Sequence, residues 1–289
     1  MNLINRKFGY FQAIGLILLV LFLPSPAGAY EETEIRDGGG YFGKVLFSGS
    51  VPPERRFHLI TFPNIEFCGA ISDGKGDRLL KEFQVSENGE FGKVVVLFVG
   101  IPKGKVFDYT PQLKIENCVI DPYITPVRNN HPIQIESRDP IVHDIQAYTL
   151  KDDYTFAMFN KPMLPKASET KMVRFRPNHY IFRVQCGVHS FMQSWGIAVG
   201  NPYFAVTGMD GRFSIGNIPP GEYDVVAWHP LMTPQVHHVK INSGGATEDL
   251  FQFDAKEGII PYHDLQTGYR FDTALTPNRI PRPTIEIQR

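Results

Sequence analysis

Short runs in which hydrophobic and polar residues alternate recur along the chain from residue 41 onward, and turn residues separate them. A period of two residues is typical of β-strands with one buried face. A fuller apolar run at 93–100 (KVVVLFVG) predicts a strand that is buried on both faces. No amphipathic helix longer than a few turns is present, so the pattern predicts an all-β fold. The alternating runs that we expect to form strands are 41–51, 131–136, 142–148, 179–186, 203–207, 212–215, 223–228, 236–241 and 249–253.

The runs fall into two groups, which predict two β-units at 41–199 and 200–253. In the second unit, Asp-Gly and Pro-Gly turns between short strands favour a β-meander. Residues 150–178 are polar and irregular, and we expect them to form a long excursion over the first unit. The acidic, Gly-rich residues 30–40 predict a flexible leader, and the polar residues 254–289 predict a loosely ordered tail.

The first 29 residues have the pattern of an export signal. Arg6 and Lys7 precede an apolar run at 13–23, and Ala27-Gly28-Ala29 fits the small-residue rule for cleavage. The run is shorter than the roughly 20 residues that a membrane span needs. We therefore expect cleavage after Ala29 and a periplasmic or secreted protein without membrane contact; the alternative is an uncleaved anchor.

The net charge and the distribution of basic residues restrict the classes of function that the chain can have. Cleavage would remove two basic residues and no acidic ones, which takes the formal net charge from −1 to −3. A mildly acidic chain without a basic cluster excludes a nucleic-acid-binding surface.

The residues with the most distinctive chemistry are Cys186, His189 and Met192, which follow the predicted strand 179–186. In that strand Cys186 shares a face with the apolar Phe182 and Val184, so its side chain should point into the core. A thiolate, an imidazole and a thioether are ligands that copper favours. We expect His143, from an earlier predicted strand, to supply a second imidazole.

Three cysteines in an exported chain leave at least one outside an intramolecular disulfide. The economical solution is a Cys68–Cys118 disulfide, which leaves Cys186 available as a metal ligand; a disulfide that closes a loop of this length stabilises by about 4 kcal/mol. The alternative pairs Cys186 with one of the other two and abolishes the copper site. The sequence leaves the connectivity open.

At these residues the chain resembles the cupredoxins, the plastocyanin-like blue-copper proteins, from about residue 89 to 199. Arg138-Asp139-Pro140 followed by His143 looks like the loop that carries the first His ligand in that family. The resemblance implies a Greek-key sandwich and one copper ion of the type-1 kind. The implied ligands are His143, Cys186, His189 and Met192.

Two features depart from the family pattern. Two residues separate His189 from Met192, where plastocyanin-like proteins usually have four. That spacing occurs in the binuclear copper A centre, but the second cysteine of its loop is absent here. The residue after the first His is usually an Asn that ties the two ligand loops together, whereas here it is Asp144. A carboxylate accepts hydrogen bonds without donating them, and we expect its charge to lower the reduction potential.

The second unit resembles a different fold family. Residues 207–228 (TGMDGRFSIGNIPPGEYDVVAW) look like the carboxypeptidase-regulatory-like β-sandwich repeat, which has a transthyretin-type fold. A cupredoxin-like unit followed by this repeat resembles exported bacterial proteins of the methylamine-utilisation or plastocyanin-like kind.

These features together predict a copper electron carrier that acts between periplasmic redox proteins, with c-type cytochromes as the expected partners. The chain lacks a Cys-x2-Cys-His motif, so we expect no c-type haem of its own. The alternative is a non-redox exported binding module, a copper store or protein-interaction partner with a vestigial site. An enzyme is not expected, because a base three residues from Cys186 on the same loop is poorly placed to activate its thiol.

Overall fold

The structure is a computed structural model that describes residues 30–151 and 154–259. The predicted signal segment and most of the predicted tail, from residue 260 onward, lie outside the described residues. The described chain consists mainly of β-strands, which confirms the all-β prediction. None of the helices in these ranges is long and apolar enough to cross a membrane.

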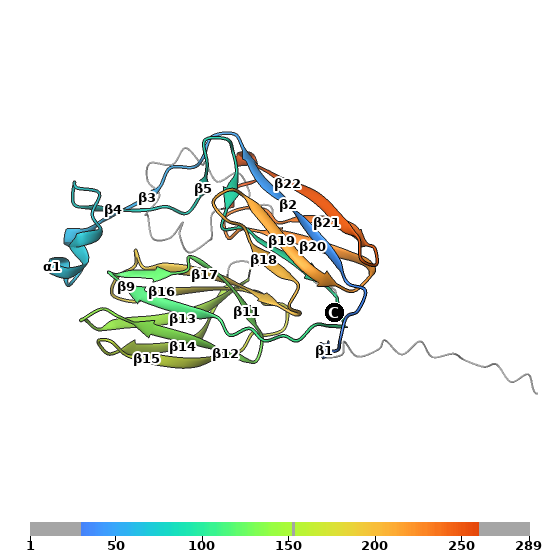
Figure 1. The fold of residues 1–289 in the computed structure, drawn as a ribbon. Helices are drawn as coiled ribbons and strands as arrows, with labels where there is room; N and C mark the ends of the chain where they lie inside the picture. Colours follow the sequence, from blue (N-terminus) through green and yellow to red (C-terminus); the bar gives the residue numbers. More distant parts are fainter. Residues whose placement is uncertain (1–29, 152–153, 260–289) are drawn as a thin grey trace, which may run out of the picture.

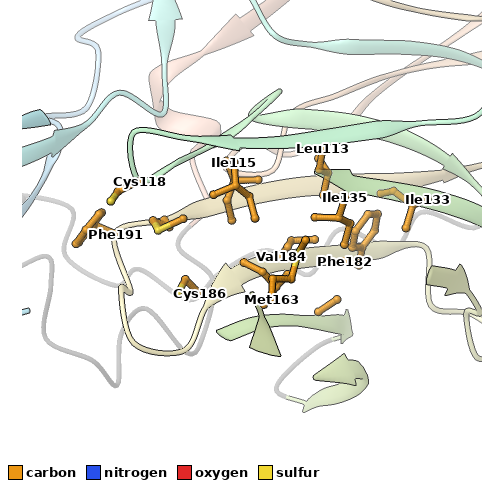
Figure 2. Close-up of a cluster of buried hydrophobic side chains, with 14 of the residues drawn as sticks. Leu113, Ile115, Cys118, Ile133, Ile135, Met163, Phe182, Val184, Cys186 and Phe191 are labelled. Carbon is orange, nitrogen blue, oxygen red and sulfur yellow. The ribbon is translucent and has the colours of Figure 1, made fainter. Parts of the chain in front are cut away.

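Two β-sandwiches make up most of the molecule (Figure 1). In the first sandwich a four-stranded sheet of order β10-β9-β12-β15 packs on a five-stranded sheet of order β11-β17-β16-β13-β14. Alternate residues of each strand enter the core between the sheets, as Ile135, Phe182 and Val184 do in Figure 2. The strands are β9 (Gln112–Glu116), β10 (Val119–Asp121), β11 (Ile124–Arg128), β12 (His131–Ser137), β13 (His143–Lys151), β14 (Tyr154–Met163), β15 (Ser168–Val173), β16 (Ile181–Cys186) and β17 (Gln193–Val199).

Strands β14 and β15 occupy the segment 150–178, for which an irregular excursion was predicted. β14 forms a hairpin with β13, and β15 pairs with β12. The prediction was wrong because β15 exposes every second side chain and buries little besides Val173. A polar composition here reflects a solvated face of an outer strand, and it does not mark a loop.

The second sandwich packs sheet β18-β7-β20-β21 against sheet β19-β2-β22. Aromatic residues dominate its core, where Tyr41 lies edge-on to Phe98 and Phe251 lies against Phe213. Its strands are β2 (Gly39–Ser48), β7 (Val95–Val99), β18 (Phe204–Val206), β19 (Arg212–Ile218), β20 (Gly221–Trp228), β21 (Gln235–Ile241) and β22 (Ala246–Asp254).

The sheets do not follow the predicted boundary at residue 200. β2 lies between β19 and β22, and β7 lies between β18 and β20, so both strands belong to the second sandwich. The sequence placed them in the first unit because alternation shows which face of a strand is buried without showing its partner. The predicted flexible leader is also held at both ends: β1 (Glu31–Glu32) pairs with β8 (Lys103–Gly104), and β2 begins at Gly39.

The two sandwiches pack on each other through an apolar layer. β7 and β20 of the second sandwich contribute Leu97 and Trp228, and β11 and β17 of the first contribute Ile124 and Trp195. These side chains are at most 3% exposed. The interface is therefore a third part of the hydrophobic core, and the sandwiches form one body.

An arm, residues 55–80, leaves the second sandwich between β2 and β7 and covers one end of the first (Figure 1). The arm's Phe57, Leu59 and Leu80 are buried in the same core as Ile115 of β9. The arm comprises β3 (Arg55–His58), η1 (Leu59–Thr61), α1 (Ile65–Cys68), η2 (Gly69–Ile71) and β4 (Asp77–Leu80). The remaining short elements are β5 (Gln84–Val85), β6 (Phe91–Gly92) and η3 (Ala255–Glu257).

Candidate metal centre

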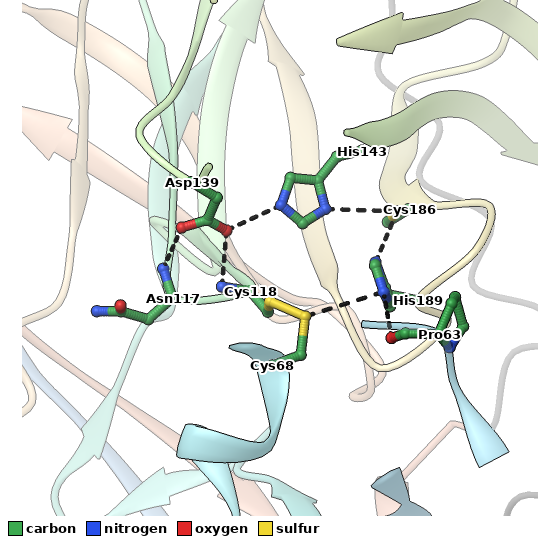
Figure 3. Close-up of a disulfide and its surroundings, with 8 residues drawn as sticks. All are labelled: Pro63, Cys68, Asn117, Cys118, Asp139, His143, Cys186 and His189. Carbon is green, nitrogen blue, oxygen red and sulfur yellow. Dashed lines mark hydrogen bonds and ion pairs between the residues drawn. A yellow bond between two sulfur atoms is a disulfide. The ribbon is translucent and has the colours of Figure 1, made fainter. Parts of the chain in front are cut away.

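Three of the four predicted ligands converge at one end of the first sandwich. β13 begins at His143, the neighbouring β16 ends at Cys186, and His189 lies in the turn that follows. The sulfur of Cys186 is 3.9 Å from Nδ1 of His143 and 3.6 Å from Nδ1 of His189 (Figure 3). All three side chains are 0% exposed. Their nitrogen and sulfur atoms lie close enough together to hold one metal ion.

The outer nitrogen of each imidazole has an oxygen partner. Nε2 of His143 is 2.8 Å from Oδ2 of Asp139, and Nε2 of His189 is 3.0 Å from the carbonyl oxygen of Pro63. Because both partners are hydrogen-bond acceptors, the protons belong on the Nε2 atoms. The Nδ1 lone pairs are then left to face the sulfur of Cys186, which is the orientation that two metal-binding imidazoles require.

Asp139 is itself held in place. Its carboxylate accepts hydrogen bonds from the backbone N–H groups of Asn117 (2.6 Å) and Cys118 (2.9 Å), and it is only 1% exposed. Three donors, counting His143, therefore fix this buried carboxylate. A rigid acceptor of this kind orients the ring of His143.

The electrostatics of the site suit a bound cation. Burial lowers the pKa of His143, against the opposing effect of Asp139, and burial likewise lowers the pKa of His189. Burial raises the pKa of the Cys186 thiol, although the backbone N–H groups of Val188, Asp144 and His189 act the other way. Neutral imidazoles offer their lone pairs, and a metal cation would stabilise the thiolate that burial disfavours. Two imidazoles with one thiolate form the donor set of blue-copper sites, so these residues fit copper.

Met192 is buried close to this group, in the core of the first sandwich. Its backbone N–H donates to the carbonyl of His189 (2.8 Å), and its carbonyl accepts from the N–H of Cys186 (3.1 Å). These two bonds close the ligand turn on itself. Axial ligation by the Met192 sulfur stays a prediction.

Asp144 joins the two ligand strands, but through its main chain. Its carbonyl oxygen accepts from the N–H of Gly187 (2.7 Å), whereas its carboxylate accepts from the side-chain amide of Gln146 (2.7 Å). The loop-tying role that the resemblance implied for the side chain is thus filled by the backbone. The expected effect of the Asp144 charge on the reduction potential stays a prediction.

The structure joins Cys68 to Cys118 and leaves Cys186 as a free thiol, as the cysteine count suggested. The disulfide links the end of α1 to the turn after β9, so it fastens the arm to the first sandwich. It also lies beside the ligands: the sulfur of Cys68 is 3.8 Å from Nε2 of His189 (Figure 3).

Two parts of the site were missed from the sequence. Asp139 lies in the loop that resembled the first-ligand loop, and an acid four residues before a candidate ligand was an available signal. Pro63 contributes only a main-chain oxygen, which no pattern of side chains reveals.

Comparisons with known proteins give weak and partial likenesses. No family model matches the chain, and no curated protein does. Among solved structures, a purple cupredoxin from Nitrosopumilus maritimus is 12% identical, with a TM-score of 0.26, over 30% of this chain and 98% of its own. Amicyanin from Paracoccus versutus is 14% identical, with a TM-score of 0.26, over 37% of this chain and 98% of its own.

A copper-containing nitrite reductase from Thermus scotoductus SA-01 is 8% identical over 36% of this chain, and the match spans only a quarter of that enzyme (25%), with a TM-score of 0.26. None of these likenesses assigns a function at such scores. The predicted likeness of the second sandwich to the carboxypeptidase-regulatory repeat stays a prediction.

Proposed function

We propose that this chain is an exported copper protein that holds one copper ion at His143, Cys186 and His189 and carries electrons. The observation that supports it best is the convergence of two Nδ1 atoms on a buried thiol while both Nε2 atoms are engaged by fixed acceptors. A bound copper would supply the one-electron chemistry. Strand ends and hydrogen-bonded neighbours hold the ligands, so little rearrangement would accompany a change of oxidation state.

The site suits a carrier better than a catalyst. All three donors are 0% exposed, so a metal held by them would be shielded from a substrate in solution. Met192 would serve as a weak axial ligand from the same turn. A redox protein such as a c-type cytochrome would be the partner, and the predicted export signal would place this chain in the periplasm or outside the cell.

Visible absorption tests this proposal. We expect copper(II) added to the protein to produce an intense thiolate-to-copper band that saturates at one equivalent. Cys186→Ser should abolish the band, because an alcohol cannot replace the thiolate in this transition. Met172→Ala is a matched control, since Met172 is an exposed sulfur residue of β15, and it should leave the band unchanged. A colourless wild-type protein would contradict the proposal.

A second function, copper storage without electron transfer, is favoured by the same complete burial of the donors. Reversible reduction of the bound copper distinguishes an electron carrier from a copper store. A carrier should lose its band on addition of ascorbate and regain it with ferricyanide over many cycles without loss of copper. A store should release copper or fail to recover the band.

A further inference from the structure

The arm closes the site on the side where His189 lies. Its Pro63 carbonyl accepts the Nε2 proton of His189, and its Phe62 ring packs edge-on against Phe191 of the ligand turn, with centroids 5.0 Å apart. Phe57 of the arm also lies near Phe191, with ring centroids 6.4 Å apart. The arm thus covers the ligand turn with a main-chain acceptor and two aromatic rings.

The disulfide connects the partners of both imidazoles. On the arm, the N–H of Cys68 donates to the carbonyl of Asn64 (2.8 Å), so Cys68 is one helical turn from the residue that follows Pro63. On the sandwich, the N–H of Cys118 donates to Asp139, the partner of His143. The Cys68–Cys118 bond therefore joins the acceptor of His189 to the support of the acceptor of His143.

A cleft beside the arm reaches the disulfide and Met192, but it does not reach the three converging donors. It has a volume of about 240 Å³, and Leu80, Cys118, Phe191 and Met192 are among its lining residues. His143, Cys186 and His189 do not line it. A small thiol could approach Cys118 from this cleft, whereas the three donors are 0% exposed and have the arm over the side where His189 lies.

We propose that the arm is a lid locked by the Cys68–Cys118 disulfide, so that copper enters and leaves the site when this bond is open and is retained when it is closed. This inference rests on the proposed function. A dithiol would open the lid: its two sulfurs form a disulfide with each other, and two electrons and two protons pass to Cys68 and Cys118, which become thiols. Reoxidation by a protein disulfide would reverse the exchange and shut the lid.

Alkylation of Cys186 in the metal-free protein tests the lock without copper. With the disulfide intact, Cys186 is the single thiol of the chain, and we expect iodoacetamide to modify it slowly under native conditions. In the double variant Cys68→Ser/Cys118→Ser, modification should be about tenfold faster or more, since local opening of the arm is enough to expose it.

The control separates opening of the arm from a general loss of stability. Phe251→Ala removes a fully buried ring from the second sandwich, away from the arm, and destabilises the protein with the disulfide intact. Its Cys186 should stay protected. Equal alkylation rates in wild type and the serine variant, or an equally fast Phe251→Ala, would overturn the lid.

If the serine variant does not fold, wild-type protein treated with dithiothreitol replaces it, and peptide mass spectrometry resolves the three cysteines. The same rates for Cys186 before and after reduction would again overturn the lid.

Copper loading then distinguishes failure of the lid from failure of the copper site. With copper(II) sulfate, the visible band should grow slowly in the disulfide-bonded protein and about tenfold faster in the serine variant. Equal rates would overturn the lid and leave the copper site intact. No band in either protein would overturn the copper site, and with it the metal-gating part of the inference, while the alkylation rates would still decide whether the arm is locked.

Discussion

At the scale of single residues, the histidines show how the two ring nitrogens decide what a buried imidazole does. In His143 and His189 one nitrogen bonds an oxygen and the other faces the Cys186 sulfur. In His229 both nitrogens bond the main chain: Nε2 donates to the carbonyl of Glu82 (3.2 Å), and Nδ1 accepts from the N–H of Leu231 (3.3 Å). His229 therefore has no lone pair left for a ligand and is a structural residue.

His229 makes stability depend on pH. It is 0% exposed, and burial lowers its pKa from 6.5 to about 3. Between these values the unfolded chain binds a proton that the folded chain does not, so the free energy of unfolding falls as the pH drops from about 6.5 towards 3. Above pH 6.5 this contribution is constant. At pH 4.5 the loss should be a few kcal/mol, because each unit of pKa difference corresponds to about 1.4 kcal/mol.

Urea unfolding of His229→Gln measures this contribution. The amide keeps a donor and an acceptor without titrating, so the variant should lose less stability between pH 7.5 and 4.5 than wild type does. The lowered pKa values of His143 and His189 will preserve part of the slope. Identical pH profiles for the two proteins would contradict the assignment.

At the scale of elements, a buried ion pair ties the base of the arm to the ligand turn. Arg55 of β3 forms two hydrogen bonds with Glu82 (3.0 and 2.6 Å), and the same guanidinium donates to the side chain of Gln193 (2.6 Å). Gln193 follows Met192 and donates in turn to the carbonyl of Ser190 (2.6 Å). The arm is thus connected to the ligand turn by polar contacts, in addition to the disulfide that joins it to the turn after β9.

Removing one member of this ion pair should lower the free energy of unfolding substantially. Glu82→Ala removes the carboxylate that accepts two hydrogen bonds from the buried Arg55, and removing one partner of a buried ion pair typically costs about 3–5 kcal/mol. Arg55 and Glu82 have side chains that are 0% and 3% exposed, so water cannot replace the lost partner. Denaturant unfolding measures the difference.

Glu136→Ala provides the matched control. Its ion pair with Arg138 has both side chains about half exposed, at 48% and 46%, and its loss should cost no more than about 1 kcal/mol. Equal destabilisation by the two substitutions would show that the buried pair is not special.

At the scale of the whole molecule, the chain path makes the two sandwiches interdependent. β2 and β7 precede the first sandwich in sequence but form central strands of the second. The apolar layer around Trp195 and Trp228 then joins the sandwiches face to face. The second sandwich therefore combines two separate stretches of sequence, whereas the strands of the first, β9 to β17, follow one another without interruption.

Truncation tests this interdependence. A chain that ends at residue 199 keeps β2 and β7 but loses all of their partner strands, β18, β19, β20 and β22. It should expose two unpaired strands and fail to unfold cooperatively, and it should aggregate on size-exclusion chromatography. A chain that ends at residue 259 keeps every described strand and should behave as wild type. Cooperative unfolding of the 1–199 chain would support the sequence-based boundary instead.

Much of the candidate site could be read from the sequence, because its signals are local. Alternation in 179–186 placed Cys186 on the inward face, and His189 follows it within one turn. The thiol and imidazole of the turn indicated copper by residue type alone, whereas His143 lies 43 positions before Cys186 and was predicted from its own strand and the family resemblance. The strands could likewise be predicted from local sequence patterns, except β14 and β15, whose solvent-facing residues resembled a loop.

The tertiary structure decided what lies around those residues. Pro63 meets His189 from 126 positions away through a backbone carbonyl, a group that every residue has. β2 and β7 pair with strands more than 100 residues away in the sequence. The sequence did not predict these pairings, because periodicity defines the buried face of a strand and leaves its neighbour unspecified. The sequence alone thus determined the strands and the ligand chemistry. Only the fold could bring the arm and its disulfide over the site, because that depends on which surfaces pack together.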